Sequence, residues 1–369
     1  MIATNLIINF IRLHTILLKI NGSFGEGGGQ ILRSTISLSV LLQKPVEIYN
    51  IRSNRPKSGL RAQHIHTIKI LADIFNAKVE NLVLGSQFLR FIPNADDKYF
   101  EDRSQAIKVN IGTAGSISMV LQALIPSIAL SKKFIDIQII GGTDIRMSPT
   151  IDYLRYVVLE AYKIIGINFN IDVLRRGYYP KGGGIVNAKI FPCKNLDLID
   201  LIDNKRIDPK IIGICSNVSR HVLDRQISSA ILSLERNDLI CNSYVASIEN
   251  AISPGTSVLV YSKSDFGPYI GGDSIGEINK PAEYIGKEAA TKFLKNYNKK
   301  VCIDQYLADM LVIPASLANG RSRYLIGEVT EHLRTNLYVV NKIVGCRYSI
   351  ISHDENYIVN IEGNPCLNN

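Results

Sequence analysis

Residues suited to phosphate chemistry occur near both ends of the chain. The first group is the run Gly25-Glu26-Gly27-Gly28-Gly29-Gln30-Ile31-Leu32-Arg33-Ser34. Its glycines let the backbone approach a bulky anion, and the apolar residues that follow predict a helix whose positive N-terminus faces that anion. A plain glycine-rich turn is the alternative, because the run fits neither the Walker pattern nor the dinucleotide-binding fingerprint.

The second group centres on His332, which precedes an apolar helical stretch at 337–344. A neutral imidazole nitrogen can attack an activated phosphorus at neutral pH, because the ordinary pKa of histidine lies near about 6.5. A lone histidine between a strand and a helix is more often structural than catalytic. The residues alone therefore leave both roles open.

A third segment places Arg52 and Arg55 beside Pro56 and Gly59, in a short irregular stretch just before a predicted helix. Side chains in such a stretch can converge on a ligand, and a planar guanidinium can grip two phosphate oxygens at once. For any single arginine, a solvated surface charge is the alternative.

These segments belong to a series of blocks that occur in one order along the chain. The blocks are 25–34, 51–64, Gly141-Gly142-Thr143-Asp144, Tyr179-Pro180-Lys181-Gly182-Gly183-Gly184, Tyr306-Leu307-Ala308-Asp309 and His332-Leu333-Arg334-Thr335-Asn336. In this order they resemble the RNA 3′-terminal phosphate cyclase family, from about Leu18 to about residue 362. Six ordered blocks are far more specific than any one motif.

The resemblance implies a reaction in three steps. His332 would attack the α-phosphorus of ATP, release pyrophosphate and hold AMP as a phosphoramidate. The AMP would pass to an RNA 3′-phosphate, and the neighbouring 2′-hydroxyl would then displace AMP to leave a 2′,3′-cyclic phosphate. ATP, an RNA with a 3′-phosphate end and a divalent metal, Mg²⁺ or Mn²⁺, are the implied cofactors and partners.

The resemblance also implies roles for individual residues. His332 would be the nucleophile, and Glu26 would contact the metal. Contacts to RNA or phosphate are implied for Gln30, Arg33, Arg52, Arg55, Gln63 and His64. Contacts to ATP are implied for Gln122, Tyr306, Leu307, Ala308, Asp309 and Met310. His66, two residues after His64, is expected to face elsewhere on a helix.

Met310 departs from the family pattern, which commonly has glutamine there. Methionine loses the amide hydrogen bonds but can still pack against adenine. The block 220–226 contains His221 between two arginines and invites a second catalytic interpretation, although a structural or RNA-positioning role is favoured.

Two other functions remain open. A non-catalytic relative of the cyclases in ribosomal RNA processing is one, but such relatives lack the nucleophilic histidine. A small-molecule transferase of repeated α/β architecture, such as an enolpyruvyl transferase, is the other, and the histidine block does not resemble those enzymes.

The expected fold is α/β (α+β). Helical periodicity at 60–75, 153–165 and 337–344 is followed each time by a break and an alternating strand pattern. This recurrence predicts repeated units of paired helices on a small sheet, and the resemblance implies the same with a smaller α/β insert. We expect the larger domain at 18–193 and 281–369, the insert at 194–280, and an N-terminal extension of doubtful role at 1–17.

Composition sets broader limits. The chain has 369 residues, 46% hydrophobic and 20% charged, which is typical of a globular protein. A net charge of +9 favours a polyanionic partner without requiring one. Six scattered cysteines predict free thiols in a reducing cytoplasm, with no zinc-site spacing. The apolar stretch at 5–18 is short and charged, so no membrane partner is expected, and the sequence does not indicate an oligomeric state.

Overall fold

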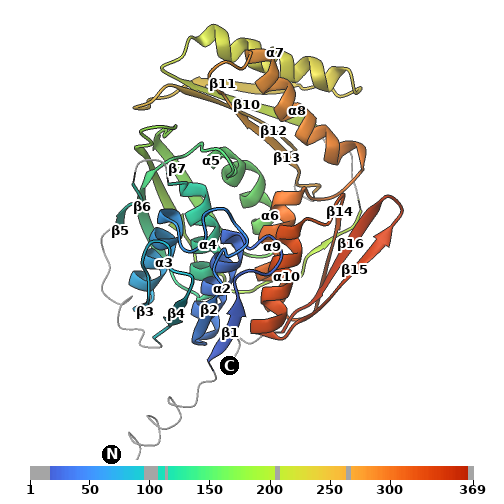
Figure 1. Ribbon diagram of the computed structural model, residues 1–369. Coiled ribbons are helices and arrows are strands. Elements are labelled where there is room, and N and C mark those ends of the chain that lie inside the picture. Colours follow the sequence, from blue (N-terminus) through green and yellow to red (C-terminus); the bar gives the residue numbers. More distant parts are fainter. Residues whose placement is uncertain (1–16, 95–106, 113–114, 204–207, 263–266, 365–369) are drawn as a thin grey trace, which may run out of the picture.

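The computed structural model describes residues 17–94, 107–112, 115–203, 208–262 and 267–364. The extension predicted at 1–17 lies almost entirely outside these ranges. Three sheets of four strands, each with paired helices, form the larger part of the molecule, and a fourth sheet lies above them (Figure 1).

The first repeat follows the order strand, helix, strand, helix, strand, strand. Its elements are β1 (Leu18–Asn21), α2 (Gly29–Leu42), β2 (Val46–Tyr49), α3 (Ala62–Ile74), β3 (Lys78–Glu80) and β4 (Leu89–Ile92). The strand order in the sheet is β1-β2-β4-β3, with β1 and β2 parallel and the other pairs antiparallel. The helix predicted at 60–75 is confirmed as α3.

The second repeat has the same connectivity and the equivalent strand order, β5-β6-β8-β7. Its strands are β5 (Ile107–Asn110), β6 (Ile135–Gly141), β7 (Phe169–Arg175) and β8 (Gly184–Ile190). Its helices are α4 (Ile117–Leu130), α5 (Ile151–Tyr153), the π-helical turn η2 (Leu154–Val158) and α6 (Leu159–Lys163). The predicted helix at 153–165 is therefore one continuous helical segment with a π turn in its middle.

The third repeat has the same order of strands and helices, although the insert lies between its first strand and its first helix. Its elements are β9 (Asp200–Leu201), α9 (Gln305–Leu317), β14 (Arg321–Ile326), α10 (Glu331–Val344), β15 (Arg347–His353) and β16 (Asn356–Glu362). The sheet order β9-β14-β16-β15 matches those of the other two repeats. The predicted internal repetition is thus confirmed at the level of topology.

The insert forms a sheet of its own, in the order β11-β10-β12-β13, with two helices on one face. Its elements are β10 (Pro209–Ser216), α7 (Arg220–Glu235), β11 (Ser243–Ile248), β12 (Gly255–Ser262), β13 (Gly271–Ile275) and α8 (Ala282–Asn298). Residues of β10 and β12 alternate between two cores. Ile211 and Val258 pack with α7 and α8, whereas Ile212 and Leu259 join the core of the larger part.

The limits of the insert, predicted at 194–280, stay a prediction. Two features of the structure favour different limits for the insert. Strand β9 pairs with β14 in the third repeat, so it belongs to the larger part. Helix α8 packs against α7 and shares its hydrophobic cluster through Ile285 and Phe293. We therefore propose that the insert runs from β10 to the end of α8.

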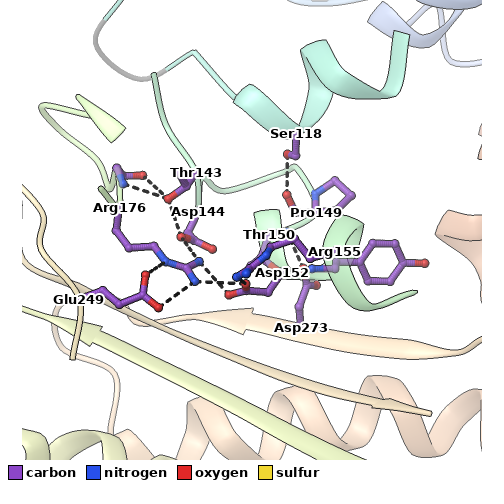
Figure 2. A network of polar contacts seen from close by, with 12 residues as sticks. Ser118, Thr143, Asp144, Pro149, Thr150, Asp152, Arg155, Arg176, Glu249 and Asp273 are labelled. Atoms are coloured by element: carbon purple, nitrogen blue, oxygen red, sulfur yellow. Dashed lines mark hydrogen bonds and ion pairs between the residues drawn. The ribbon is translucent and has the colours of Figure 1, made fainter. Parts of the chain in front are cut away.

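A buried cluster of charged residues joins the insert to the second repeat (Figure 2). Arg176, which is fully buried, lies 2.7 Å from Glu249 beside β11 and 2.7 Å from Asp152 of α5. Asp273 of β13 also accepts a hydrogen bond from the backbone N–H of Thr150 (2.7 Å). The insert is therefore attached through polar contacts as well as through its sheet.

The free thiols expected from the sequence are confirmed for the five cysteines in the described ranges, and Cys366 lies outside them. Within the described ranges, none of the helices combines the length and apolar character needed to cross a membrane.

Candidate active site

His332 lies in the first turn of α10, which begins earlier than the sequence predicted. Thr330 caps the helix, since its hydroxyl accepts a hydrogen bond from the backbone N–H of Leu333 at 3.0 Å. Helix α10 therefore starts at Glu331 instead of near Leu337, and the expected position of His332 between a strand and a helix is wrong. The cap fixes the position of the histidine at a helix end with positive potential.

Two carboxylates flank the His332 imidazole. Its Nε2 lies 3.5 Å from Glu26 Oε2, and its Nδ1 lies 3.8 Å from Asp309 Oδ2. The His332 side chain is 45% exposed, whereas that of Asp309 is only 13% exposed. The imidazole thus has Nδ1 toward the interior and Nε2 toward the more open glycine-rich loop.

Burial lowers the pKa of His332; the Glu26 carboxylate opposes this shift, and the charge of Arg33 adds to it. The imidazole is therefore mostly neutral at pH 7, which leaves one ring nitrogen with a free electron pair. Burial also raises the pKa of Asp309 well above its ordinary value. A neutral histidine beside a buried carboxyl group is suited to nucleophilic attack.

Asn336, one turn after His332, connects three helices. Its Nδ2 donates to the backbone oxygen of Asp309 in α9 (2.9 Å), and its Oδ1 accepts from Gln30 Nε2 (3.0 Å) and Ser34 Oγ (2.6 Å) in α2. Asn336 is fully buried. The sequence analysis gave it no role, although its spacing of four residues from His332 places it on the same helix face.

The glycine-rich run turns tightly against α10 before α2 begins. Gly25 has a φ of +60°, and a Cβ added there would lie 2.7 Å from the Thr335 hydroxyl. Gly28 caps α2 without a side-chain hydrogen bond, so the N-cap residue itself does not satisfy the first backbone N–H groups of this helix. The predicted helix is confirmed, and a ligand at its N-terminus stays a prediction.

Arginines gather beside this N-terminus. Arg33, only 8% exposed, donates to Gln30 Oε1, and Arg55 Nη2 donates to Glu26 Oε2. The buried Nε atoms of Arg33, Arg52 and Arg55 have no hydrogen-bond partner among the described residues. Unpaired buried donors are rare in folded proteins and indicate a place for an anionic group.

The charges of these arginines act on one another. Burial lowers the pKa of Arg33 to about 10, against the attraction of Asp309. Burial, followed by repulsion from Arg55 and Arg61, also lowers the pKa of Arg52. Both guanidinium groups remain charged at pH 7, so an anion would relieve a local excess of positive charge.

His64 lies in the first turn of α3 and is 3% exposed. Its Nδ1 accepts a hydrogen bond from the backbone N–H of Arg61 (3.1 Å), so Nε2 carries the proton in the neutral ring. Burial, together with the charges of Arg33, Arg52 and Arg61, lowers the pKa of His64 to about 3. Its Nε2 has no hydrogen-bond partner in the described part of the chain.

Two pockets meet at Arg33. The α2–α9 pocket is lined by residues that include Gln30, Arg33, Gln122, Asp309, Met310 and Ile313. The α3–α4 pocket is lined by residues that include Arg33, Gln63, His64, His66, Ser116 and Met119. The expectation that His66 faces elsewhere is thus wrong, because it shares a helix face with Gln63, three residues earlier.

Other predicted residues lie apart from these pockets. Leu307 and Ala308 are buried in the hydrophobic core, so their side chains do not face the α2–α9 pocket. Tyr306 packs edge-on against Tyr153.

The block 220–226 in α7 has structural contacts. Arg220 pairs with Asp224, Arg225 pairs with Glu283, and Gln226 Nε2 donates to Thr256 Oγ1. These contacts support the first of the two roles that the sequence favoured, structural or RNA-positioning.

Glu26 offers only one carboxylate to a metal. Across the described ranges, no group of three or more His, Cys, Asp and Glu side chains is arranged to hold a metal ion. Glu26 and its loop fit a divalent cation only if phosphate oxygens and water supply the other ligands, as is usual for Mg²⁺.

The fold is α/β, and the buried arginine donors without partners among the described residues favour an anionic ligand at this site. The model of the RNA 3′-terminal phosphate cyclase family matches residues 24–350. Curated proteins named RNA 3′-terminal phosphate cyclase are similar over most of their length. The one from Pyrobaculum aerophilum is 38% identical, covering 94% of this chain and 98% of its own. The one from Pyrococcus abyssi is 40% identical, covering 89% and 94%. The chain belongs to the RNA 3′-terminal phosphate cyclase family and is an enzyme of the ligase type.

Proposed function

We propose that this enzyme uses ATP to convert an RNA 3′-terminal phosphate into a 2′,3′-cyclic phosphate, through a covalent AMP on His332. Family membership supports the overall reaction, since the cyclase family uses ATP. The observation that carries the mechanism is the neutral, half-exposed imidazole of His332 between Glu26 and Asp309.

In the first step, the Nε2 lone pair of His332 attacks the α-phosphorus of ATP and pyrophosphate leaves. Asp309 Oδ2 faces Nδ1, so Nε2 on the opposite side of the ring is the nitrogen that is free to bond to phosphorus. Thr330 donates a hydrogen bond to Asp309 Oδ1 (3.2 Å) and also caps α10, so it aligns carboxyl group and histidine together.

In the second step, an oxygen of the RNA 3′-phosphate attacks the phosphorus of the bound AMP, and His332 leaves as a neutral imidazole. In the third step, the 2′-hydroxyl of the terminal ribose attacks the 3′-phosphorus, loses its proton and displaces AMP. Two phosphate groups must approach each other in the second step. Arg33, Arg52 and Arg55 would reduce their repulsion through donors that no described residue occupies.

Glu26 would hold a divalent cation, Mg²⁺ or Mn²⁺, together with phosphate oxygens of the nucleotide. Such an ion, when bound, neutralises phosphate charge and favours departure of the leaving group. Gln122, Asp309 and Met310 line one pocket and would bind the nucleoside part of ATP, with the Met310 side chain packing against the base.

The test is transfer of label from ATP labelled at the α-phosphate to the purified protein in the presence of Mg²⁺ or Mn²⁺. We expect the native chain to retain the label through a denaturing gel and His332→Ala to lose about a thousandfold or more of it. His353→Ala is the matched control, because His353 is exposed on β15. An RNA whose 3′-phosphate becomes resistant to phosphomonoesterase then reports cyclisation.

If the folded, metal-supplied native protein acquires no label, the covalent mechanism is wrong. Equal labelling of the native and His332→Ala proteins would contradict the assignment of the nucleophile. A non-catalytic role in RNA processing would then become the better proposal.

A further inference from the structure

Asn336 is a buried amide at the point where three helices meet. It lies on α10, one turn after His332, and it is fully buried. Burying an amide costs free energy unless its donor and acceptor find partners, and an apolar side chain of similar size would avoid that cost. Here the donor and the acceptor both have partners, so the amide fixes the relative positions of the groups that it joins.

The hydrogen bonds at Asn336 run in one direction. The backbone oxygen of Asp309 can only accept, so Asn336 turns its Nδ2 toward this oxygen (2.9 Å) and its Oδ1 the other way. That Oδ1 accepts from Gln30 Nε2 (3.0 Å), which leaves Gln30 Oε1 to accept from Arg33 Nη2. Asp309, Asn336, Gln30 and Arg33 thus form one directed series of hydrogen bonds, the amide relay.

The amide relay allows only one orientation of the Gln30 side chain. In the reverse orientation, the Gln30 amide nitrogen would face the donors of Arg33, and its oxygen would face Oδ1 of Asn336. Ser34 supports the observed orientation, because its hydroxyl donates to Asn336 Oδ1 (2.6 Å) and accepts from Gln30 Nε2 (3.2 Å). Asn336 therefore determines which way the Gln30 amide points.

Arg33 stands at the end of the amide relay. Its Nη2 donates to Gln30, whereas its buried Nε has no partner among the described residues. A guanidinium group is planar, so holding one of its nitrogens restricts the directions in which the others donate. Because Arg33 lines both pockets, the orientation of this group matters when two phosphate groups approach each other.

The carboxylate of Asp309 depends less on Asn336. Only the backbone oxygen of Asp309 accepts from Asn336, whereas its carboxylate accepts from the Thr330 hydroxyl (3.2 Å) and faces His332 Nδ1. Loss of the Asn336 amide therefore releases Gln30 and Arg33 but leaves the surroundings of His332 in place. The first and second steps of the reaction should respond differently to this loss.

We propose that Asn336 is a positioning residue for the transfer of AMP to RNA, and that it acts through Gln30 to orient the Arg33 guanidinium. The proposal rests on the cyclase function proposed above. Because Asn336 is fully buried, its effect on the second step is exerted through its hydrogen bonds.

The two steps can be measured separately. The labelled protein–AMP form of each variant is isolated and mixed with an excess of a short RNA that ends in a 3′-phosphate, and transfer of the label is followed in a single turnover. We expect Asn336→Ala to transfer AMP at least about tenfold more slowly, because a misplaced donor stabilises the reacting phosphates less. Labelling of this variant by ATP should slow less than about threefold.

Asn341→Ala is the matched control for these rates. Asn341 lies near the far end of α10, and its side chain donates to the backbone oxygen of Cys346 (3.0 Å). Its replacement removes an asparagine hydrogen bond from the same helix without touching the amide relay. We expect both rates to stay at the native value in this variant.

Two further variants test the route and the nature of the effect. If Asn336 acts through Gln30, Asn336→Ala should slow AMP transfer less than about twofold in a protein that already carries Gln30→Ala. Asn336→Leu fills the space without an amide, so it separates packing from hydrogen bonding and replaces Asn336→Ala if that variant does not fold. We expect Asn336→Leu to transfer AMP at least about tenfold more slowly than the native protein.

Three results would overturn the proposal. AMP transfer at the native rate in Asn336→Leu would show that filling the space is sufficient. Effects of the Asn336 and Gln30 substitutions that multiply in the double variant would show that the two residues act independently. Equal slowing of labelling and of AMP transfer would indicate a general structural role for Asn336.

Failure of the native protein to acquire label would contradict the proposed function without deciding what the amide relay does, and binding then tests the relay. The probe is a short fluorescent RNA with a 3′-phosphate, measured without ATP. We expect Asn336→Leu to bind this RNA severalfold more weakly than the native protein, and Asn341→Ala to bind it equally well. Unchanged affinity in Asn336→Leu would overturn the proposal in that case as well.

Discussion

Two clusters of buried arginine differ in how their N–H groups are paired. Arg176, between the second repeat and the insert, lies among Asp144, Asp152 and Glu249, and its Nε, Nη1 and Nη2 atoms all have carboxylate partners (Figure 2). At the candidate active site, by contrast, the Nε atoms of Arg33, Arg52 and Arg55 lack partners among the described residues.

The pKa shifts of the two clusters have opposite signs for a physical reason. Burial alone would lower the pKa of Arg176, but Asp152 and Asp144 raise it well above its ordinary value. Burial lowers the pKa of Arg33 to about 10, and the attraction of Asp309 does not compensate. A buried arginine surrounded by carboxylates holds the fold together, whereas one grouped with other arginines is available for an anionic ligand.

Removing the charge of Arg176 is the most direct test of whether its cluster stabilises the fold. Arg176→Met leaves three carboxylates without their cation, so we expect the free energy of unfolding to fall by about 3–5 kcal/mol. Denaturant unfolding at pH 7 measures this change. Arg323→Met is the control, because Arg323 forms an exposed pair with Asp200 and its loss should change the free energy of unfolding much less. A loss below that of the control would show that the cluster does not anchor the insert.

Substitution of Arg33 by Met should impair activity and leave stability unharmed. Arg33→Met removes a buried charge that lacks a full set of partners, so we expect the free energy of unfolding to stay unchanged or to rise. Cyclisation should fall by about 10²–10³-fold, because a donor to the reacting phosphates is lost. Full cyclase activity in a stable Arg33→Met protein would contradict its assignment to both pockets.

Arg33→Met should also move the pH dependence of labelling. The positive charge of Arg33 lowers the pKa of His332, so its removal should raise that pKa. The acid limb of the labelling rate would then shift to higher pH, which a structural change alone would not produce.

The sequence predicted the repeats because each helix and strand has its own periodicity, as in α3 and β7. It did not predict the start of α10, since the cap at Thr330 depends on one side-chain contact. The resemblance aligned 306–310 as one block, but five consecutive residues span more than a helical turn and cannot all face one pocket. Leu307 and Ala308 are therefore in the core, while Asp309 and Met310 line the pocket.

His66 and Asn336 are two residues of the site that the sequence analysis did not place there. Whether a helical side chain faces a site depends on which neighbouring helix lies opposite, and spacing along one helix does not supply that information. The block 141–144 is similar: the sequence marked it as part of the family pattern, but only the fold brings Asp144 to Arg176. Its contacts assign it to the anchoring of the insert.

The smallest expected effect in this comparison concerns the pH dependence of stability. Burial raises the pKa of Asp144 from 3.8 to about 6, against the opposing charge of Arg176 and with the help of Asp152. Because its folded pKa is higher than its unfolded pKa, the native state binds more protons than the unfolded state between about pH 4 and pH 6. This group therefore makes the protein less stable as the pH rises through that interval.

Asp144→Asn should remove this contribution. Its Oδ2 accepts a hydrogen bond from the Thr143 hydroxyl at 2.7 Å, and an amide oxygen can accept the same bond. As the pH rises from 4 to 6, we expect the free energy of unfolding to fall by about 1–3 kcal/mol more in the native protein than in the variant. Denaturant unfolding across that range measures this difference. Part of the native slope should persist, because burial also raises the pKa of Asp304 to about 6. Asp136→Asn is the control, because Asp136 is partly exposed on β6. If Asp144→Asn leaves the slope of the free energy of unfolding against pH unchanged, Arg176 keeps Asp144 ionised throughout this range.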